Sequence, residues 1–543
     1  MATGSEAGPV TPGSLEAAAG FQSGEPRRWR AWQLAVPAGA TLSLTLWGIT
    51  RASFWRDEAA TLSVLRRSMP AFWRMLDHTD VVHGLYYLIL WPLVRVLGFG
   101  ELGTRLPSAV AMAGAAAGVT AIARRLLSPR IGLAAGLTFA TLPLTSRYGQ
   151  EARSYAMVMA LAVLASYLLV RIVEADEQGA ARRRWLAAYA AVLTLLGWAN
   201  LISLLIVPAH AVTLLWSARS ACARLAGGQP GAGALAQRRR AAGWLIAVAV
   251  AGALVFPLVA LAWRQRHGTQ RFLTMTTFSS VASVPRGLTG SWLVCVAVLA
   301  LGLAVVAIRG PIRNTLTRLC VPWLLLPPFL LLGMGLVTPI YDPRYILFCV
   351  PALALLAGSW LDAVGVRAAA WWGNRSRTTM ARQSPVPPRC ARADVRAVSA
   401  VVAGVAVIAL LGLPAQFTYR APDGHGDNVR QVAQILADHD HSGDGVLYFW
   451  PWWRQISAAY PHAFGHLHDV SLARSPAQDG NFTGTQLPVT QIRGRLATIP
   501  RVWLVEFQQY RRFKPYPALA ASTWKVARQW HASDFWLTLY VHR

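Results

Sequence analysis

The sequence has few charged residues, and acidic residues are especially scarce. Only 14% of the 543 residues are charged, against roughly 25% in soluble domains, which excludes an ordinary soluble enzyme. Hydrophobic residues make up 54%, and 24 acidic residues stand against 52 basic ones, for a formal net charge of +28. On a soluble chain this excess would indicate nucleic-acid binding. Here the arginines gather in short segments between long apolar runs, so the composition predicts a polytopic membrane protein without a nucleic-acid partner.

Cysteine gives no sign of a metal or redox site. The chain has five cysteines, their spacing fits neither a zinc nor a redox motif, and none follows Cys390. The sequence therefore implies no disulfide framework.

Long apolar segments predict the membrane spans, because about 20 apolar residues are needed to cross the hydrocarbon layer. The eleven candidate segments are residues 31–50, 106–123, 131–146, 155–173, 185–199, 201–217, 243–262, 288–308, 319–337, 345–361 and 398–414. Segment 84–98 is apolar but short, with Trp91-Pro92 in its middle, and is expected to be an interfacial helix. The prediction is thus an α-helical membrane domain over 31–414, with about eleven transmembrane helices, after a disordered cytoplasmic tail at 1–30.

Arginine clusters orient these spans. Arg27, Arg28 and Arg30 precede the first span, so the N-terminus is predicted to be cytoplasmic by the positive-inside rule. Further clusters recur in alternate loops, and the remaining loops are predicted to face outward. These external segments are residues 51–105, 147–154, 263–287 and 338–344, with everything after residue 415.

Residues 415–543 differ from the membrane domain in their pattern. Apolar residues have helical spacing over 427–438, whereas short apolar runs at 446–450, 502–505 and 535–541 are typical of strands. Helices that alternate with such strands indicate a small α/β domain. The predicted topology makes this domain extracytoplasmic.

Two adjacent carboxylates, Asp57 and Glu58, follow the first span. Carboxylates at the membrane surface are costly to leave unpaired. One interpretation makes Asp57 the N-cap of a helix over 59–68. The other makes it a general base, assisted by its neighbour, that acts on a substrate hydroxyl.

Asp77, His78, Asp80 and His83 lie further along the same loop. These residue types can bind a divalent metal, but their spacing matches no familiar metal motif. A metal is therefore an interpretation that we do not favour, and no cofactor is predicted.

The second external loop holds Glu151 between Arg147 and Arg153. A structural ion pair between Glu151 and one of these arginines is one interpretation. The other is a role for the three charges in a site shared with the first loop.

A further external loop leads into Arg344 at the outer end of an apolar span. A guanidinium is always charged and can donate to two oxygens at once, so Arg344 is suited to bind a phosphate. The alternative is that its side chain extends to lipid headgroups.

Five motifs occur in a fixed order along the predicted external loops. They are Asp57-Glu58, His83 before Leu85-Tyr86-Tyr87, Arg105 through Ala109, Arg147 through Tyr155, and Arg344-Tyr345 before a proline-containing span. With these motifs the chain resembles the integral-membrane glycosyltransferases of the GT-C fold. More narrowly, it is similar to the protein O-mannosyltransferase and aminoarabinose-transferase superfamily and its bacterial mannosyltransferase or arabinofuranosyltransferase relatives. The resemblance covers residues 31–361.

The resemblance implies catalytic roles for three carboxylates. Asp57 would deprotonate the acceptor hydroxyl, and Glu58 would be its neighbour in the same motif. Glu151 matches a second acidic residue that orients donor or acceptor.

The resemblance also implies a binding set. Arg344, with Arg153 or Arg147, would hold the phosphate of a polyprenyl-phosphate sugar. Gly84 departs from the usual His-Pro-Pro-Leu-Tyr pattern, which puts the role of the preceding histidine in doubt. The other residues of these motifs predicted to bind substrate are His83, Tyr87, Tyr341 and Tyr345.

The implied activity is inverting transfer of a sugar of the mannose or arabinofuranose class from a polyprenyl-phosphate donor. The acceptor would be a glycan, glycolipid or protein at the outer face of the cytoplasmic membrane, among membrane lipids. An oligosaccharide ligase could use the same scaffold. A transporter or lipid flippase would carry ionisable residues within its spans and often repeated halves, which this sequence does not show; a non-enzymatic envelope-assembly protein is the last alternative.

Overall fold

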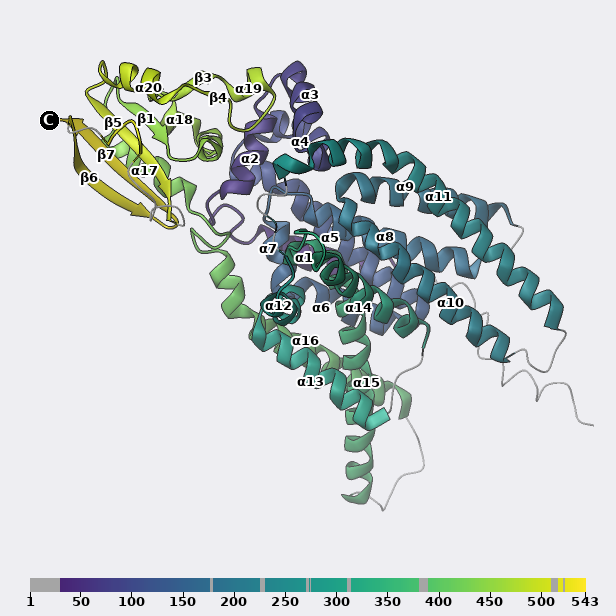
Figure 1. Ribbon diagram of the computed structural model, residues 1–543. Coiled ribbons are helices and arrows are strands. Elements are labelled where there is room, and N and C mark those ends of the chain that lie inside the picture. Colours follow the sequence, from purple (N-terminus) through teal and green to yellow (C-terminus); the bar gives the residue numbers. More distant parts are fainter. Residues whose placement is uncertain are drawn as a thin grey trace, which may run out of the picture.

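The computed structural model describes residues 30–175, 179–224, 230–269, 273, 275–309, 314–379, 389–508, 516–520 and 523–543. The predicted tail at 1–30 lies outside these residues except for Arg30. A helical body occupies most of the chain, and a smaller sheet-containing domain formed by the C-terminal residues lies at one end of it (Figure 1).

The body is built from helices of very different length. Its α-helices are α1 (Trp32–Leu46), α2 (Arg56–Leu65), α3 (Met69–His78), α4 (Gly84–Leu97), α5 (Glu101–Leu126), α6 (Pro129–Thr141), α7 (Pro143–Gly149), α8 (Tyr155–Glu174), α9 (Ala180–Ala199), α10 (Ile206–Arg224), α11 (Pro230–Thr269), α12 (Phe278–Thr289), α13 (Trp292–Arg309), α14 (Thr315–Gly335), α15 (Val350–Thr379) and α16 (Arg389–Tyr419). Three 3-10 helices join them: η3 (Val81–His83), η4 (Leu201–Leu205) and η6 (Pro343–Cys349).

Within the described ranges, six helices are long and apolar enough to cross a membrane, or seven if α12 and α13, bent by 84°, form one span. Each of the eleven segments predicted from hydropathy falls on helical structure, but several are short or divided. The first, α1, has only 15 residues. Segment 131–146 divides where Pro143 begins α7, because proline cannot donate the hydrogen bond that would continue α6. A multi-pass helical fold is confirmed, whereas the number eleven stays a prediction.

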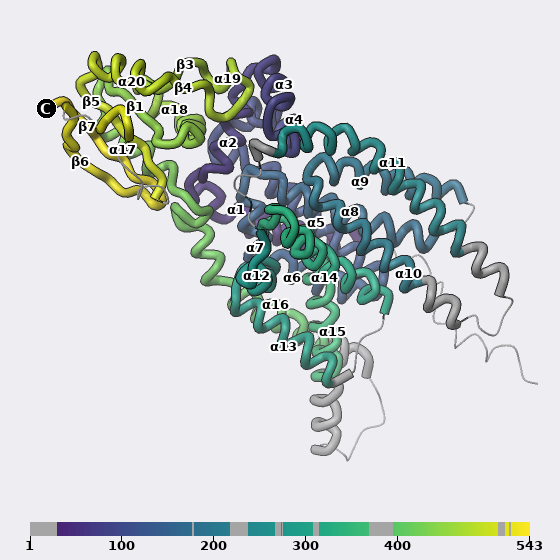
Figure 2. The backbone as a smooth tube through the Cα atoms, in the orientation of Figure 1, coloured from purple at the N-terminus to yellow at the C-terminus, as the bar shows by residue number. Residues whose placement is uncertain are grey.

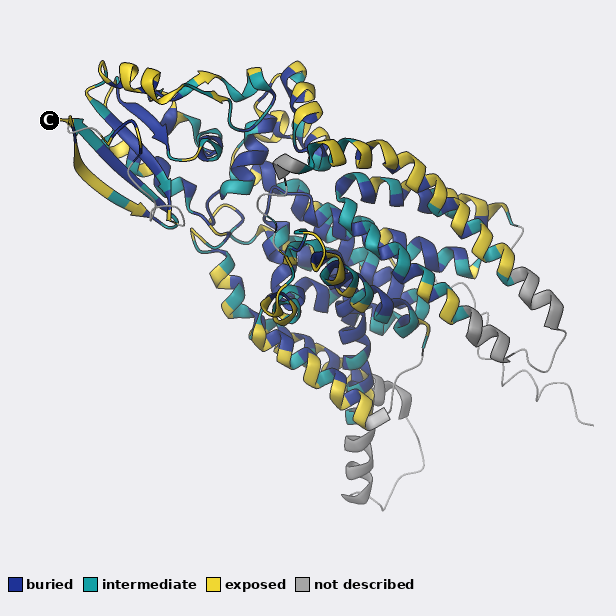
Figure 3. Ribbon diagram, viewed as in Figure 1, coloured by how far each residue is buried: buried dark blue, intermediate teal, exposed yellow. Residues whose placement is uncertain are grey.

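The body has its core where α5, α8 and α15 meet the other helices. Helix α5 packs against α1, α6 and α8, and α15 packs against α6 and α16. In the span Pro343–Ala368, which runs from η6 into α15, 94% of the most apolar 18-residue window is buried inside the protein. Figure 3 shows exposed residues instead along the outer sides of α11, α13 and α16. Large apolar side chains such as Phe256 and Leu303 lie there, as expected of helices that face hydrocarbon.

The C-terminal domain contains a five-stranded mixed sheet. Its strands are β1 (Gly445–Tyr448), β2 (His468–Asp469), β5 (Arg501–Phe507), β6 (Trp524–Ala532) and β7 (Phe535–His542), in the order β2-β1-β5-β7-β6. Strands β2, β1 and β5 are parallel, and β7 and β6 add to them in antiparallel register. Smaller elements surround this sheet: α17 (Val429–His439), η7 (Pro451–Ala458), α18 (Pro461–Phe464), β3 (Leu472–Arg474), α19 (Pro476–Asp479), β4 (Thr485–Gln486) and α20 (Val489–Leu496).

The predicted α/β character of this domain is confirmed. Helix α17 and strands β1, β5 and β7 match the predicted helix and the three predicted strands. Strand β6 was not predicted, because it is an edge strand whose central residues are mostly exposed and polar, so it has no apolar run.

The segment that follows α1, predicted to be the first external loop, contributes to the core of the C-terminal domain. Phe54, Ala59 and Leu62 are buried in one cluster with side chains of α17, β5 and β7. Figure 2 shows α2 lying between the helical body and the C-terminal domain. The predicted boundary at residue 415 falls inside α16, which continues to Tyr419. Packing on both sides therefore fixes the segment that carries Asp57.

Candidate active site

Asp57 lies in the first turn of α2. The helix begins at Arg56 after the extended residue Trp55, and no side chain caps it. Asp57 is thus inside the helix, and the interpretation of Asp57 as the N-cap of a helix over 59–68 is wrong. The positive end of the helix dipole favours a carboxylate at this position.

Glu58 is sealed in a bidentate ion pair with Arg105 from α5. Arg105 Nε and Nη2 donate to the two carboxylate oxygens at 2.8 Å and 2.6 Å, and both side chains are 0% exposed. The amide of Ala152 donates to the same carboxylate at 2.8 Å. Although burial opposes ionisation, Arg105 holds the pKa of Glu58 well below its usual range. Glu58 therefore joins the segment after α1 to the segment after α7, and it has no open face toward a substrate.

Arginines also bind the carbonyl groups that lead from α1 to α2. Arg105 Nη1 donates to the carbonyls of Ile49 and Ala52 at 2.8 Å and 2.9 Å, and Nη2 donates to that of Ser53 at 2.9 Å. Arg420, after α16, donates to carbonyls at the start of this segment, and Arg430, in α17, donates to carbonyls in its middle. Part of the arginine excess thus serves to fix the loop before Asp57.

Asp57 pairs with Arg344 across 287 residues of sequence. Arg344 Nη1 donates to Asp57 Oδ2 at 2.7 Å, and Arg344 Nη2 donates to Asp342 Oδ2 at 2.6 Å. The side chains of Asp57 and Arg344 remain 25% and 30% exposed. A guanidinium has five N–H groups. The described hydrogen bonds use the Nε–H and one N–H on each terminal nitrogen, so each terminal nitrogen keeps one N–H for a ligand.

Asp57 is ionised in this environment. Burial raises its pKa, but the nearby positive charges of Arg344, Arg153 and Arg56 outweigh burial and leave the pKa below the ordinary value of 3.8. A carboxylate that is charged and partly exposed can accept a proton from a substrate hydroxyl.

A second hydrogen-bonded group connects α4 to the loop after α7. Arg153 Nη2 lies 3.0 Å from His83 Nε2, and His83 Nδ1 lies 2.7 Å from Asp80 Oδ1. Because a guanidinium can only donate, Nε2 accepts and His83 is the neutral tautomer with its proton on Nδ1. Tyr87 OH donates to Asp80 Oδ2 at 2.6 Å. Arg153 forms no ion pair with a carboxylate in the described part of the chain, so its charge is not directly neutralised.

The four polar residues considered for a metal do not come together. His78 Nδ1 contacts the carbonyl of Arg74, whereas Asp80 and His83 bind each other. Among the described residues no group of three or more His, Cys, Asp or Glu side chains could hold a metal ion. Asp80 instead adopts a left-handed conformation with φ of 60°, a strained geometry for a non-glycine residue that often marks functional sites.

Glu151 forms the structural ion pair that was one interpretation of its loop. One carboxylate oxygen accepts from Arg147 Nη1, and Arg147 Nη2 donates to the carbonyl of His425 at 3.2 Å. Burial raises the pKa of Glu151, and the charge of Glu58 adds to the rise. Arg147 is thus engaged inside the protein, whereas Arg153 lies beside the group formed by Asp57 and Arg344.

The two remaining tyrosines of the predicted set occupy different environments. Tyr341 is buried, and its OH donates to the carbonyl of Ser280 at 3.0 Å, so it ties the Arg344 loop to α12. Tyr345 is half-buried, within electrostatic range of Asp57, Arg153 and Arg344.

Four further residues of this region were not assigned a role from the sequence. Arg105 was part of a motif without a function, and Asp342 was not noted as a partner of Arg344. Trp55 and His425 carry no motif that could have identified them. Gly424 and Gly426 on either side of His425 are a faint signal, because paired glycines often mark a backbone that must approach other groups closely.

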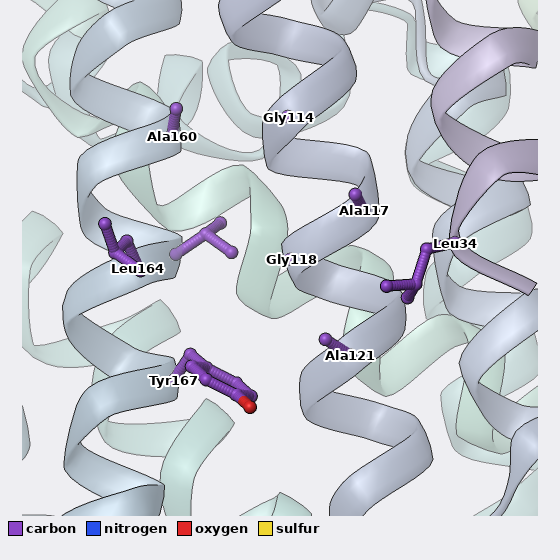
Figure 4. Close-up of a pocket in the computed structure, with 9 residues that line it drawn as sticks. Leu34, Gly114, Ala117, Gly118, Ala121, Ala160, Leu164 and Tyr167 are labelled. Carbon is purple, nitrogen blue, oxygen red and sulfur yellow. The ribbon is translucent and has the colours of Figure 1, made fainter. Parts of the chain in front are cut away.

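An apolar pocket of about 450 Å³ lies between α1, α5 and α8 (Figure 4). Its lining is almost entirely alanine, glycine, leucine and valine, with Tyr167 the exception. No charged residue of the site described above contributes to it.

Comparisons with known proteins agree with this architecture. The crystal structure of ArnT from Cupriavidus metallidurans bound to undecaprenyl phosphate superposes with a TM-score of 0.58 at 14% identity, covering 94% of this chain and 98% of that one. The chain has the GT-C fold. The apo structure of the same ArnT gives a TM-score of 0.57 at 14% identity with the same coverage. The resemblance to the GT-C membrane proteins predicted from the sequence is confirmed.

Two other comparisons cover a smaller part of this chain or superpose on it less closely. The family model described as dolichyl-phosphate-mannose-protein mannosyltransferase matches residues 77–228. The matched residues include His83, Glu151 and Arg153, but they include neither Asp57 nor Arg344. The archaeal oligosaccharyltransferase AglB from Archaeoglobus fulgidus has a TM-score of 0.49 at 9% identity, covering 89% of this chain and 70% of that one. No curated protein sequence matches this chain.

Proposed function

We propose that this protein is a membrane glycosyltransferase that moves a sugar from a polyprenyl-phosphate donor to an acceptor hydroxyl at the outer face of the cell membrane. The observation that carries the proposal is the partly exposed ion pair between Asp57 and Arg344, with the guanidinium of Arg153 nearby. It puts a proton acceptor and two phosphate-binding groups in one place. ArnT, which shares the fold, has been crystallised with undecaprenyl phosphate.

Asp57 is the proposed catalytic base. As the acceptor oxygen attacks the anomeric carbon, its proton passes to the Asp57 carboxylate. The bond from that carbon to the phosphate oxygen breaks, and the electron pair leaves with the polyprenyl phosphate. A single displacement of this kind inverts the configuration of the sugar.

Arg344 and Arg153 are the proposed phosphate ligands. Asp342 and Asp57 neutralise Arg344, which nevertheless keeps one N–H on each terminal nitrogen. Arg153 pairs with no carboxylate among the described residues, and it supplies the net positive charge that a departing phosphate needs. Arg147 is not assigned this role, because its charge is paired with the buried carboxylate of Glu151, whereas Arg153 lies near Asp57.

Glu58 and Glu151 each fix another part of the site through an arginine in this proposal. Glu58 fixes α2 through Arg105, and Glu151 fixes the second loop through Arg147. His83 and Tyr87 hold Asp80 and orient Arg153.

The sequence resemblance supports a sugar of the mannose or arabinofuranose class, and the family match supports mannose in particular. The acceptor in this proposal is a glycan, glycolipid or protein, and no metal is assigned. The N-terminus would be cytoplasmic and the C-terminal domain extracytoplasmic, so that the donor reaches the site from the outer leaflet.

The proposal is tested with the full-length protein in nanodiscs and a set of polyprenyl-phosphate sugars, each radiolabelled in the sugar. Membranes from a strain that lacks the gene provide the acceptor. We expect label to move from one of these donors to a membrane acceptor, with inversion at the anomeric carbon. Transfer from nucleotide sugars alone would contradict the proposal.

Arg153→Ala is expected to weaken binding of polyprenyl phosphate by about 10- to 100-fold, because a charge-assisted hydrogen bond contributes roughly 1.5–3 kcal/mol. The same variant should move the acidic limb of the transfer rate to higher pH. Arg153 lowers the pKa of Asp57, so without it the carboxylate is protonated at a higher pH. Titration calorimetry and a pH–rate profile measure the two effects.

Arg74→Ala is the matched control for this variant. Arg74 is an exposed arginine on α3, in the same external loop as Asp57, so its loss changes net charge equally. Equal affinities of the Arg153→Ala and Arg74→Ala proteins for polyprenyl phosphate would rule out Arg153 as a phosphate ligand.

A further inference from the structure

Within the described part of the chain, three buried side chains near Arg147 keep polar atoms without a hydrogen-bond partner. These atoms are Trp55 Nε1, Glu151 Oε1, and both ring nitrogens of His425. All three residues are at most 6% exposed. A buried polar atom without a partner is energetically costly, and most such atoms in proteins are paired. Four of them in one place indicate that a polar ligand or ordered water completes the group.

Arg147 is the centre of this group. Its guanidinium pairs with Glu151 and with the carbonyl of His425, and its Cζ lies 5.9 Å from the centre of the Trp55 ring. The His425 imidazole approaches Glu58 Oε2 to 3.9 Å, which is too long for a hydrogen bond. We call Trp55, Glu151 and His425 the inner polar set.

The inner polar set adjoins the proposed reaction centre. The Cζ atom of Arg344 lies 5.4 Å from the centre of the Trp55 ring, so one indole lies close to both Arg344 and Arg147. The carboxylate of Glu151 is within electrostatic range of Arg344 and Asp57. If the donor's phosphate lies at Arg344, the hydroxyl groups on the far side of its sugar ring would reach the inner polar set.

The backbone holds His425 in place by means of two glycines. A Cβ atom at Gly424 would lie 2.3 Å from the carbonyl oxygen of Thr418, and Gly426 has φ of +127°. Neither position tolerates another residue without strain. The imidazole stays neutral, because burial and the charge of Arg147 lower the pKa of His425 to about 3.

The chemistry of the set favours a neutral polyhydroxyl ligand. Trp55 offers a donor, Glu151 an acceptor, and a neutral imidazole one of each. The guanidinium of Arg147 repels a cation, whereas Glu151 and Glu58 repel an anion. We propose that Trp55, Glu151 and His425 form the subsite that binds the hydroxyl groups of the donor's sugar, an inference that rests on the proposed function.

The sugar enters this subsite from the side of Asp57 and Arg344. These two side chains are partly exposed, whereas the inner polar set is enclosed. Rotation of the His425 ring breaks no hydrogen bond of the imidazole, because neither nitrogen has a partner. Binding the sugar therefore needs a side-chain movement but sacrifices no existing hydrogen bond of this ring.

The test compares two kinds of ligand by titration calorimetry on the full-length protein in nanodiscs. One is decaprenyl phosphate, and the others are decaprenyl-phosphate mannose, glucose and arabinofuranose. We expect one sugar-bearing lipid to bind wild type at least tenfold more tightly than decaprenyl phosphate. Trp55→Phe, which keeps an aromatic ring but removes the indole N–H, should reduce that advantage about three- to tenfold, and His425→Ala should reduce it similarly. Both variants should bind bare decaprenyl phosphate as wild type does.

Trp453→Phe is the matched control. Trp453 Nε1 is likewise buried without a partner, but its ring stacks on Phe507 in the core of the C-terminal domain. Unchanged preference for the sugar in Trp55→Phe and His425→Ala would overturn the subsite, as would a wild-type protein that binds all four lipids equally. Failure of wild type to bind decaprenyl phosphate at all would instead overturn the proposed function, and the subsite with it.

Discussion

Asp57→Asn is expected to lower the rate of sugar transfer by about 100- to 10,000-fold, the usual contribution of a general base. Asparagine has nearly the same shape, and its amide oxygen can still accept the hydrogen bond from Arg344 Nη1. It cannot accept the proton of the acceptor hydroxyl. The affinity for polyprenyl phosphate should therefore remain within a few-fold of wild type while turnover is lost. Single-turnover transfer from the preferred donor, with calorimetric binding of polyprenyl phosphate, separates the two quantities.

The control for this prediction is Asp77→Asn, in the same segment between α1 and α4. Asp77 is exposed at the end of α3, so the same chemical change there should leave transfer unaffected. A well-folded Asp57→Asn protein with wild-type turnover would falsify the assignment of Asp57 as the base. Equal loss of turnover in both variants would indicate a general effect on the loop.

Arg105→Met is expected to destabilise the protein by about 3–5 kcal/mol, the usual effect of leaving one partner of a buried ion pair alone. Glu58 would lose its counter-ion in an environment where both side chains are 0% exposed. Three carbonyl groups of the segment before Asp57 would lose the hydrogen bond from Arg105 in the same step, and among the described residues only that of Ala52 would keep a second donor, Arg430. The thermal unfolding midpoint of the protein in detergent, followed by tryptophan fluorescence, measures the effect.

Two further variants define what Arg105 contributes. Arg430→Met removes an arginine that also binds carbonyls of this segment. Unlike the buried pair of Arg105 and Glu58, its ion pair with Glu101 is partly exposed, with 30% of the Arg430 side chain and 16% of the Glu101 side chain accessible. Water can replace part of that interaction, so we expect a loss of about 1 kcal/mol or less. The double variant Glu58→Met with Arg105→Met should recover only part of the stability, because the carbonyls still lack the Arg105 donor. Full recovery would mean that the ion pair alone matters.

The sequence by itself predicted a multi-pass helical membrane protein, which the structure confirms, and it identified most of the charged residues that lie together in the candidate site. Apolar runs and arginine clusters are local features, so they predict helices and loops without knowledge of the packing. The strands β1, β5 and β7 were found for the same reason. Asp57, Arg153 and Arg344 were identified because a charge at the edge of an apolar segment is costly unless it has a function.

Only the tertiary structure decided what each charge does. Glu58 follows Asp57 directly, yet the helical turn of α2 directs one carboxylate to Arg105 inside the protein and the other to Arg344 at a partly open surface. Nothing in the spacing of residues 57 and 344 encodes that contact, because it depends on how η6 packs beside α8 and α12.

The same reason explains why Trp55 and His425 were not recognised. Their significance lies in unpaired atoms inside a packed interior, and pairing is a property of neighbours in space. The contact of α2 with the C-terminal domain could not be predicted for the same reason. Phe54 and Leu62 pack against α17 and β5, which lie more than 350 residues further along the sequence. Local sequence sets which segments are apolar and which are charged, whereas the long-range packing of those segments sets which charges meet.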